Sequence, residues 1–450
     1  MSTDPVPGLL ARATEALEAE FCALPAFEPA ENSAADPTAI AKVLETVARR
    51  LGDNYPYFHP LYAGQMLKPP HPVARAAYAL AMAINPNNHA RDGGRASSQM
   101  EIEAVAVIAR MFGWTEFLGH LTSGGTMANL EALWVAGQLV PGKRIVASEQ
   151  AHYTHHRICS VLKLEFASVP SDLRGQMDLN ALENELRKGD VGTVVVTLGT
   201  TAIGAVDPLP EILRLRSQFG FRVHVDAAYG GYFRLIPDAL NEAAGRAFAA
   251  IDQADSIVVD PHKHGLQPYG CGCVLFRDPA VGRFYKHDSP YTYFTSKELH
   301  LGEISLECSR AGATAVALWA TQQLLPLTPG SLFAQGLAQG RRAALELDRR
   351  LGADPRFQPL AGGPELDIVV WKLEAPDPEE SSRLAQETFV ACAARQLHLA
   401  LVQLPQSWFG PIGASNQYRG GYVTCLRSVL MKPEHQEWLD AIWDKLTATR

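Results

Sequence analysis

The sequence predicts an α/β fold, in which a large domain of βαβ units is preceded by a helical arm and followed by a small α+β domain. Three observations lead to this prediction. From residue 91 to about 330, short β-branched runs alternate with amphipathic stretches, as in βαβ units. Beyond residue 330, helical and strand-like segments follow each other in α+β order. The 450 residues exceed the usual size of one domain. We therefore divide the chain into an arm (1–90), a large domain (91–330) and a small domain (331–450).

The arm begins with two predicted helices. Apolar residues from Leu9 to Phe21 recur on one helical face, and a second helical segment runs from Thr38 to Leu51. The following segment, 54–62, is dense in aromatic residues and proline. We expect the arm to pack on the rest of the chain or on a partner chain, and the aromatic segment to line a pocket or to join that packing.

One βαβ unit in the large domain is clear. Residues 193–197 form a buried strand, Asp207 and Pro208 start a helix as cap and first turn, Gly220 ends it, and residues 221–225 form the next strand. Such crossovers are right-handed, so the two strands are predicted to be parallel. Their C-terminal ends then share one edge of the sheet, which is where α/β sheets bind ligands.

The small domain is predicted from five segments that follow residue 330. They are a helix over 336–350, a strand over 367–371, a helix over 381–395, a strand over 423–427 and a closing helix over 434–446.

Asp226 and Lys263 follow two successive predicted strands of the large domain. Asp226 closes the run 223–225, and Lys263 lies in the loop after the run 256–260. Pyridoxal phosphate needs such a pair, because an amine holds its aldehyde covalently and a carboxylate keeps its pyridine nitrogen protonated. The alternative is that Asp226 caps a turn and that Lys263 is a solvated loop residue. We predict a pyridoxal-phosphate enzyme.

Small residues precede a predicted helix at Ser123-Gly124-Gly125-Thr126. A helix N-terminus leaves backbone N–H groups open to an anion, and the helix dipole favours negative charge there. Gly124, Gly125 and Thr126 are therefore candidates for binding the cofactor phosphate. Turns and helix caps use the same residue types, and this is the alternative.

His152 follows the strand-like run 144–147 and is a candidate for stacking on the cofactor ring. The cluster His152, His155 and His156 also suggests a zinc-dependent hydrolase. However, His152 and His156 form an i, i+4 pair only in a helix, and no Glu-x-x-His pattern accompanies them. We predict no metal site.

Two arginines stand beside small or apolar residues. Arg310 and Arg427 could each bind a substrate carboxylate through a forked guanidinium. A structural salt bridge is the alternative for each.

Composition excludes several classes of partner. The formal net charge of −8 and the pI near 6.0 predict no binding to nucleic acid or to an anionic membrane. The first residues do not resemble a signal peptide, and no apolar run reaches membrane-spanning length. The seven cysteines are odd in number and scattered, which favours buried thiols in a reducing compartment. We expect a cytoplasmic protein whose partners are a small molecule and a second copy of the chain.

Four motifs together resemble the group II pyridoxal-phosphate decarboxylases, which include the aromatic amino acid, tyrosine, histidine and glutamate decarboxylases. The motifs are 123–129 (SGGTMAN), 198–201 (LGTT), 224–231 (HVDAAYGG) and 260–263 (DPHK). The resemblance runs in order from about residue 55 to the C-terminus. It implies fold type I with a mostly parallel seven-stranded sheet, and an obligate homodimer with active sites at the interface.

The resemblance also implies a role for each matching residue. Lys263 is similar to the lysine that binds the cofactor, Asp226 to the partner of the pyridine nitrogen, His152 to the stacking histidine and Ala228 to the small residue beneath the ring. Gly125, Thr126 and His262 are similar to the residues that contact the phosphate. Thr200 or Thr201 resembles the threonine near the cofactor hydroxyl and substrate carboxylate, and Arg427 resembles the arginine that holds the α-carboxylate in some relatives.

Relatives also use a tyrosine on a loop to return a proton to the α-carbon, and Tyr291 and Tyr293 are the candidates. The sequence does not choose between them. Many relatives carry tryptophan after the lysine, whereas this chain has His264. This departure bears on the choice of substrate.

We predict decarboxylation of an aromatic L-amino acid (tyrosine, phenylalanine, tryptophan or DOPA) to its amine and CO2. Tyr62, Trp134, Tyr229 and Phe294 are candidate pocket aromatics. The alternatives are an acidic substrate, glutamate or aspartate, and aldehyde synthesis with the same cofactor.

Overall fold

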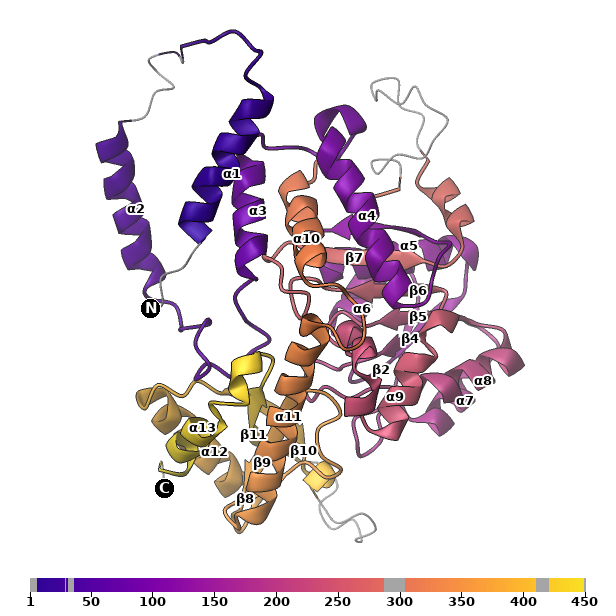
Figure 1. The fold of residues 1–450 in the computed structure, drawn as a ribbon. Coiled ribbons are helices and arrows are strands. Elements are labelled where there is room, and N and C mark those ends of the chain that lie inside the picture. The colour runs from indigo at the N-terminus through magenta and orange to yellow at the C-terminus, as the bar shows by residue number, and fades with distance from the viewer. Residues whose placement is uncertain (1–5, 29, 31–35, 287–303, 410–420, 449–450) are drawn as a thin grey trace.

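The computed structural model describes residues 6–28, 30, 36–286, 304–409 and 421–448. The N-terminal helices stand along one side of the large domain, and the small domain lies below both in Figure 1. The strands of the large domain form one central sheet with helices packed against it (Figure 1). We propose the domain boundaries at about residues 90 and 330 on the basis of the sequence.

The arm contains the two helices that the sequence predicted. They are α1 (Val6–Glu20) and α2 (Pro37–Leu51), followed by α3 (Pro72–Met82). Asp36 caps α2 by accepting a hydrogen bond from the Thr38 amide at 3.0 Å. Neither α1 nor α2 has a buried residue, whereas α3 packs against α1 and against α10 (Gly312–Leu324). The arm therefore joins the large domain mainly through α3.

The large domain is built on a seven-stranded sheet in the order β1-β7-β6-β5-β4-β2-β3. The strands are β1 (Leu118–Thr122), β2 (Arg144–Ser148), β3 (Phe166–Val169), β4 (Val191–Thr197), β5 (Arg222–Asp226), β6 (Ser256–Val259) and β7 (Gly272–Phe276). Only β7 runs against its neighbours, β1 and β6. The β-branched run 194–196 of β4 is fully buried, as expected for a strand covered on both faces. The prediction of a mostly parallel α/β sheet is confirmed.

Helices cover this sheet and connect its parallel strands. Besides α10, they are α4 (Arg95–Met111), α5 (Gly125–Leu139), α6 (Thr154–Leu162), α7 (Leu179–Leu186), α8 (Leu209–Phe219) and α9 (Glu242–Ala249). The predicted unit β4-α8-β5 is present, and β4 pairs with β5 in parallel. Gly220 ends α8 with a φ of +74°, a left-handed conformation that favours glycine.

The predicted capping role of Asp207 is wrong. Helix α8 begins at Leu209, and the Asp207 side chain points back toward the sheet. Its carboxylate accepts hydrogen bonds from the Met177 and Thr197 amides, each at 2.8 Å. Burial raises the pKa of Asp207 to about 7, against the lowering effect of these two hydrogen bonds. Asp207 thus joins the Met177 segment to the end of β4 and does not cap α8.

The small domain packs helices on a four-stranded antiparallel sheet in the order β10-β11-β9-β8. Its elements are α11 (Leu332–Ala353), β8 (Phe357–Pro359), β9 (Ile368–Leu373), α12 (Pro378–Ala394), β10 (Ala400–Pro405), β11 (Tyr422–Val429) and α13 (Leu439–Thr447). The predicted α+β order is confirmed. The closing helix is shorter than predicted, because a separate 3-10 turn, η8 (Pro433–His435), precedes it.

The seven cysteines are free. Five are buried as expected, but Cys22 and Cys308 are exposed, which the sequence did not indicate. Among the described helices, none is long and apolar enough to cross a membrane.

Candidate active site

A cleft opens at the C-terminal edge of the parallel strands and has a volume of about 850 Å³ with its open mouth included. Segments that are far apart in sequence meet there because β2, β4, β5 and β6 all end at this edge. Its lining residues are Ser123, Gly124, Gly125, Thr126, Met127, Asn129, His152, Thr154, Thr197, Gly199, Thr201, Asp226, Ala228, Tyr229, Asp260, His262 and Lys263.

Asp226 forms the buried floor of the cleft. Its Oδ2 lies 2.9 Å from His155 Nε2, and its Oδ1 accepts the Ala228 amide at 3.0 Å. Burial alone would raise the pKa of Asp226, but these hydrogen bonds and the nearby Lys263 charge lower it well below its usual range. Asp226 is therefore a carboxylate, able to pair with a cationic ring nitrogen.

Three further polar side chains support Asp226, and the sequence did not assign them to the site. The Asn129 amide donates to Gly125 O at 2.9 Å and to Asp226 Oδ2 at 3.4 Å. His224 Nε2 lies 2.8 Å from Asn129 Oδ1. Burial lowers the pKa of His224 to about 3, so its ring is neutral and donates this hydrogen bond. The third side chain is His155, which appeared in the sequence only as part of the histidine cluster.

Lys263 lies in the loop after β6, close to a second buried carboxylate. Its Nζ is 3.1 Å from Asp260 Oδ2, and His262 Nε2 is 3.5 Å from the same oxygen. Asp260 is 3% exposed, and its Oδ1 has no hydrogen-bond partner in the described structure. The sequence signal for Asp260 was its place at the end of β6, next to Asp226 at the end of β5.

Helix α5 points its N-terminus into the cleft. Gly124, at its N-cap, has a φ of +154°, and a Cβ on Gly125 would lie 2.6 Å from Asp260 Oδ2. Glycine is therefore required where the backbone passes the Asp260 carboxylate. The free N–H groups of the first turn of α5 face the cleft and suit a phosphate group.

His152 lines the cleft just before α6. Its Nδ1 accepts the Thr154 amide at 3.3 Å and lies 2.8 Å from Thr154 Oγ1. Burial lowers the pKa of His152, so the ring is neutral with its proton on Nε2. A flat neutral imidazole at this place suits stacking on an aromatic ring.

These features fit pyridoxal phosphate: an amine, an ionised carboxylate, a stacking imidazole and an anion-binding helix N-terminus lie in one cleft. The Pyridoxal-dependent decarboxylase conserved domain matches residues 39–373 of the chain. The chain belongs to the pyridoxal-dependent decarboxylase family. It is a pyridoxal-phosphate-dependent lyase.

Several relatives in the decarboxylase family are named after their substrates. The L-tyrosine decarboxylase of Enterococcus faecium is 28% identical over 445 residues, with 75% of this chain and 72% of that protein covered. The probable L-tyrosine/L-aspartate decarboxylase of Methanothermobacter thermautotrophicus is 28% identical over 336 residues, with 72% of this chain and 86% of that protein covered.

Solved structures share the decarboxylase fold. Mouse CSAD in apo form has a TM-score of 0.78 at 20% identity, covering 97% of this chain and 91% of that chain. The TDC of Oryza sativa, solved with PLP and tryptamine, has a TM-score of 0.77 at 17% identity, covering 100% of this chain and 98% of that chain. The predicted fold type I is therefore confirmed.

The two candidate threonines of the decarboxylase differ in position. Thr201 lines the cleft, whereas Thr200 is fully buried and its Oγ1 accepts the Ala205 amide at 3.0 Å. This leaves Thr201 as the threonine available to a ligand. Gly199 between them and β4 has a φ of +106°, and a Cβ there would lie 3.0 Å from the Gly230 nitrogen.

Arg427, on β11, lies behind the cleft and does not line it. Its guanidinium donates to the carbonyl oxygens of Thr201 at 2.8 Å and Ala202 at 2.9 Å, and to Gln65 Oε1 at 3.1 Å. Burial lowers the pKa of Arg427. The residue joins the small domain to the loop that carries Thr201.

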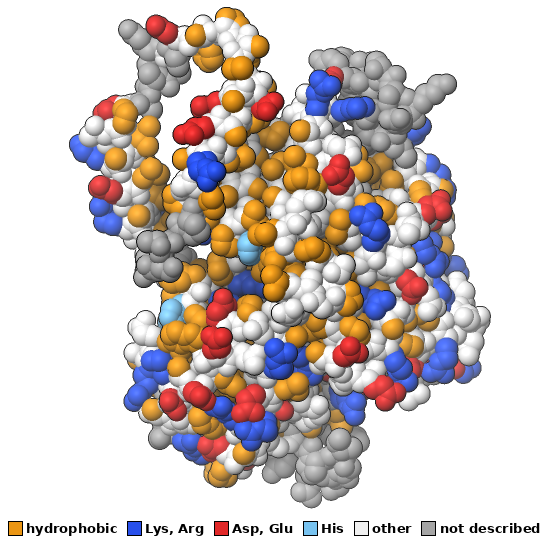
Figure 2. All heavy atoms as spheres, in the orientation of Figure 1, with side chains coloured by type: hydrophobic (Ala, Val, Ile, Leu, Met, Phe, Trp, Pro, Cys, Tyr) orange, Lys and Arg blue, Asp and Glu red, His pale blue; other side chains and the backbone are white. Residues whose placement is uncertain are grey.

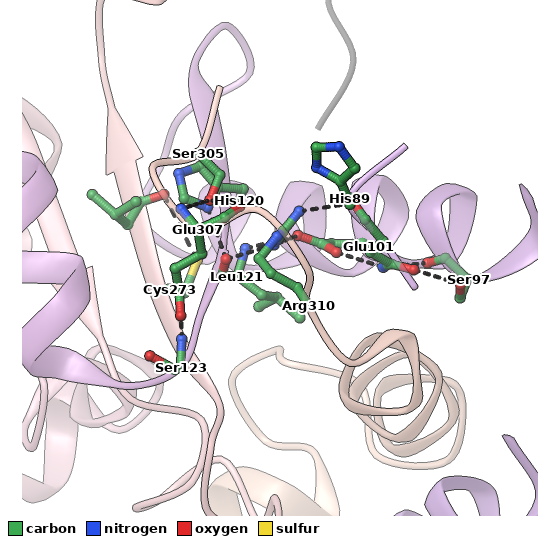
Figure 3. Close-up of polar contacts among 12 residues, drawn as sticks. His89, Ser97, Glu101, His120, Leu121, Ser123, Cys273, Ser305, Glu307 and Arg310 are labelled. Atoms are coloured by element: carbon green, nitrogen blue, oxygen red, sulfur yellow. Dashed lines mark hydrogen bonds and ion pairs between the residues drawn. The ribbon is translucent and has the colours of Figure 1, made fainter. Parts of the chain in front are cut away.

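The assignment of Arg310 to substrate binding is corrected. Arg310 Nη1 lies 2.6 Å from the buried Glu101 carboxylate and donates to Leu121 O at 2.7 Å (Figure 3). Glu101 is 1% exposed. If Arg310 turned away to bind a substrate, the buried carboxylate of Glu101 would lose the partner of its charge. The structural salt bridge is thus the correct alternative, and Arg310 does not line the cleft.

The remaining predicted residues differ in position. Of the pocket aromatics, Tyr229 lines the cleft, but Trp134 packs on Tyr285 and Tyr62 packs on Tyr57. Tyr291, Tyr293 and Phe294 lie outside the described residues.

The zinc alternative does not match the position of the histidines. Helix α6 begins at Thr154, so His152 precedes it, while His155 turns inward to Asp226 and His156 is exposed. In the parts of the chain that the structure describes, no group of three or more His, Cys, Asp or Glu side chains is placed to hold a metal.

Replacing His155 by leucine should raise the pKa of Asp226, because the effect of burial would no longer be opposed by that hydrogen bond. The pairing with the cofactor ring weakens, and we expect an affinity for pyridoxal phosphate about tenfold lower or more. A fluorescence titration of the folded variant measures this. His156→Leu, an exposed neighbour, is the control. Equal affinities of both variants would contradict a supporting role for His155.

Proposed function

We propose that the enzyme decarboxylates an aromatic L-amino acid to the corresponding amine and CO2, with L-tyrosine as the first candidate. The names of the relatives support L-tyrosine, since one is an L-tyrosine decarboxylase and the other a probable L-tyrosine/L-aspartate decarboxylase. The second name also includes an acidic substrate, which the amine assay below tests. The main support is the small number of cationic side chains that line the cleft.

Among the described residues that line the cleft, Lys263 is the one Lys or Arg. We propose that its amine binds the cofactor, so it is not available to pair with a substrate side chain. An acidic substrate carries a second carboxylate, and burying that charge requires a second cation. Tyr229 borders the cleft, but its ring packs on His264 and its hydroxyl donates to Asp367. The lining therefore favours an uncharged substrate side chain over glutamate or aspartate, and the tyrosine in the names of the relatives supports an aromatic one.

Each cleft residue has a proposed role. When bound, the cofactor supplies a conjugated cationic ring that accepts the electron pair left on the α-carbon. Lys263 holds the cofactor and Asp226 keeps its ring nitrogen protonated. His152 would stack on the ring of the bound cofactor, and the small side chain of Ala228 would leave room beneath that ring. The N-terminus of α5 at Gly124, Gly125 and Thr126 binds the phosphate together with His262. Thr201 contacts the cofactor hydroxyl and the substrate carboxylate.

Arg427 is proposed to attract the α-carboxylate of the substrate. Its guanidinium is 2.8 Å from the carbonyl of Thr201, whose side chain lines the cleft. Its hydrogen-bond partners there are neutral oxygens, so its charge stays available to an entering anion. Tyr291 or Tyr293 is proposed to return the proton to the α-carbon.

An amine assay tests the substrate proposal. The purified enzyme is incubated separately with tyrosine, phenylalanine, tryptophan, DOPA, glutamate and aspartate, and amine is quantified by chromatography. We expect amine from at least one aromatic substrate and none from the acidic ones. Amine from glutamate or aspartate alone would reject the aromatic assignment.

The same incubations test aldehyde synthesis, the second use of this cofactor. Aldehyde, ammonia and peroxide are measured beside amine. An aldehyde product in place of the amine would show that the cleft directs the reaction away from simple decarboxylation.

We also propose a homodimer with active sites at the interface. Supporting this, α1 and α2 leave large apolar side chains exposed, among them Leu9, Val43, Leu44 and Leu51, each 54–61% exposed. Apolar surface runs along both helices in Figure 2. Covering it with a second copy removes it from water. Light scattering should give twice the chain mass of 48.9 kDa, and a stable monomer would contradict the proposal.

A cytoplasmic location is proposed as well. Its support is the free state of the seven cysteines, five of them buried, which suits a reducing compartment. Fractionation of cells that produce the protein tests it.

A further inference from the structure

A second cavity lies where the arm, the large domain and the small domain meet. Its volume is about 910 Å³ with the open mouth included, and it shares no lining residue with the active-site cleft. Segment 68–72 of the arm, the loop after Lys263, the start of α11 and the turn η8 contribute to it. Figure 2 shows a hollow in this region, below the N-terminal helices, with basic atoms at its floor.

Two lysine side chains reach this cavity. Lys432 is 3% exposed, and its Nζ donates to Tyr62 O at 2.6 Å, while Lys68 Nζ donates to Met431 O at 3.2 Å. In the described part of the chain neither amine has a carboxylate within 4.0 Å. An ammonium group has three N–H donors, so each lysine retains donors for a ligand.

Burial lowers the pKa of Lys68 to about 8 and that of Lys432 to about 7, and the proximity of Lys68 adds to the effect on Lys432. At neutral pH Lys68 is therefore mainly an ammonium group and Lys432 is partly one, and a bound anion would favour the protonated form of both. The buried Asp367 offsets part of the Lys68 charge, but it does not lie within ion-pair distance of either amine. Glu434 lines the cavity as well, but it is exposed at the protein surface, where water screens its charge. An anion between the two amines would therefore be favoured.

His264 adds an unused polar atom to the same wall. The residue is 1% exposed and its Nδ1 has no hydrogen-bond partner among the described residues. Its Nε2 lies 3.3 Å from Asp367 Oδ2. A buried ring nitrogen without a partner is costly unless a ligand or water meets it.

Most of the remaining lining is apolar, apart from Glu434 and His71, whose Nδ1 accepts the Val73 amide. Leu266, Leu325, Phe333 and Leu337 line it, and Leu332 stands at its mouth with 71% of its side chain exposed. A ligand that fills the cavity thus meets cations at one end and apolar side chains along its body.

We propose that this cavity binds a small organic anion, a carboxylate or phosphate ester with an apolar body, whose charged group lies on Lys68 and Lys432. The apolar part packs on Leu266 and Phe333. The site is separate from the active-site cleft, and it does not depend on which amino acid the enzyme decarboxylates.

Phenyl phosphate is a suitable probe, because it joins a phosphate ester to an apolar ring. Its binding to the enzyme saturated with pyridoxal phosphate is measured by titration calorimetry, so that the phosphate site of the cleft is already filled. We expect one site per chain. Lys68→Met and Lys432→Met should each weaken binding about tenfold or more, because each removes a charge-assisted hydrogen bond.

A third variant decides the outcome even if a lysine variant fails to fold. Leu332→Glu places a negative charge at the mouth of the cavity, at an exposed position in the first turn of α11 where an acidic residue suits the helix. It should weaken binding several-fold, whereas Leu345→Glu, exposed on the same helix and outside the cavity, should not. Absence of binding at millimolar probe, full competition by the amino-acid substrate, or equal affinity of the Leu332→Glu and Leu345→Glu variants would overturn the proposal.

Discussion

Replacing Lys263 by alanine is expected to give a folded protein that holds pyridoxal phosphate without a covalent bond and turns over at a rate lower by a factor on the order of 10³ or more. The Lys263 amine lies in the cleft, 3.1 Å from Asp260, with 22% of its side chain exposed. It is thus accessible to an aldehyde and held near a carboxylate that can accept its proton.

Borohydride reduction followed by peptide mapping measures the covalent bond directly. In the unmodified enzyme the label is expected on Lys263, and in the alanine variant no lysine should carry it. Lys188→Ala, a surface change at a lysine with 57% exposure, is the control and should keep both the label and the activity. A label on another lysine of the unmodified enzyme would refute the assignment.

Replacing Asp226 by asparagine should lower the decarboxylation rate by on the order of 10²-fold or more, corresponding to the loss of a buried charge pair of about 3–5 kcal/mol. Asparagine keeps the shape, and its one acceptor oxygen can still accept the Ala228 amide. Its NH2 group then faces His155 and can donate to that ring when the His155 proton is on Nδ1, which has no partner among the described residues. It cannot hold a positive charge on the cofactor ring. Rate and cofactor affinity should therefore fall while the unfolding temperature changes little.

The control for this change is Asp238→Asn at an exposed position, which should leave the rate unchanged. The absorption spectrum of the bound cofactor adds a second measurement, since it reports the protonation of the ring. An Asp226→Asn enzyme with an unaltered rate and spectrum would show that another group keeps the ring nitrogen protonated.

Much of the site could be predicted from local sequence. Asp226 and Lys263 follow adjacent β-branched runs, and the parallel order of β5 and β6 brings their ends to one edge. Gly124 and Gly125 were predictable because a run of small residues before a helix is a local signal. Lys263, Asp226, His152 and the start of α5 are all found in the cleft.

Residues that support these groups could not be predicted in the same way. His155 contacts Asp226 across 71 positions of sequence, and Asn129 contacts it across 97. Which face of α6 or α5 turns inward depends on how each helix packs on the sheet. For the same reason the sequence left Arg310 open, because its partner Glu101 is 209 positions away.

Strand periodicity, helix periodicity and the motifs are local, so the α/β class, the order of the main elements and the chemistry of the cofactor pair could be read from the amino-acid order. Which side chains meet depends on the folded arrangement. It paired Arg310 with Glu101, turned His155 and Asn129 toward Asp226, placed Asp260 beside Lys263, and brought Lys68 and Lys432 to one cavity. The physical reason is that a buried charge or hydrogen-bonding group requires a partner, and the packing of distant elements decides which partner lies within reach.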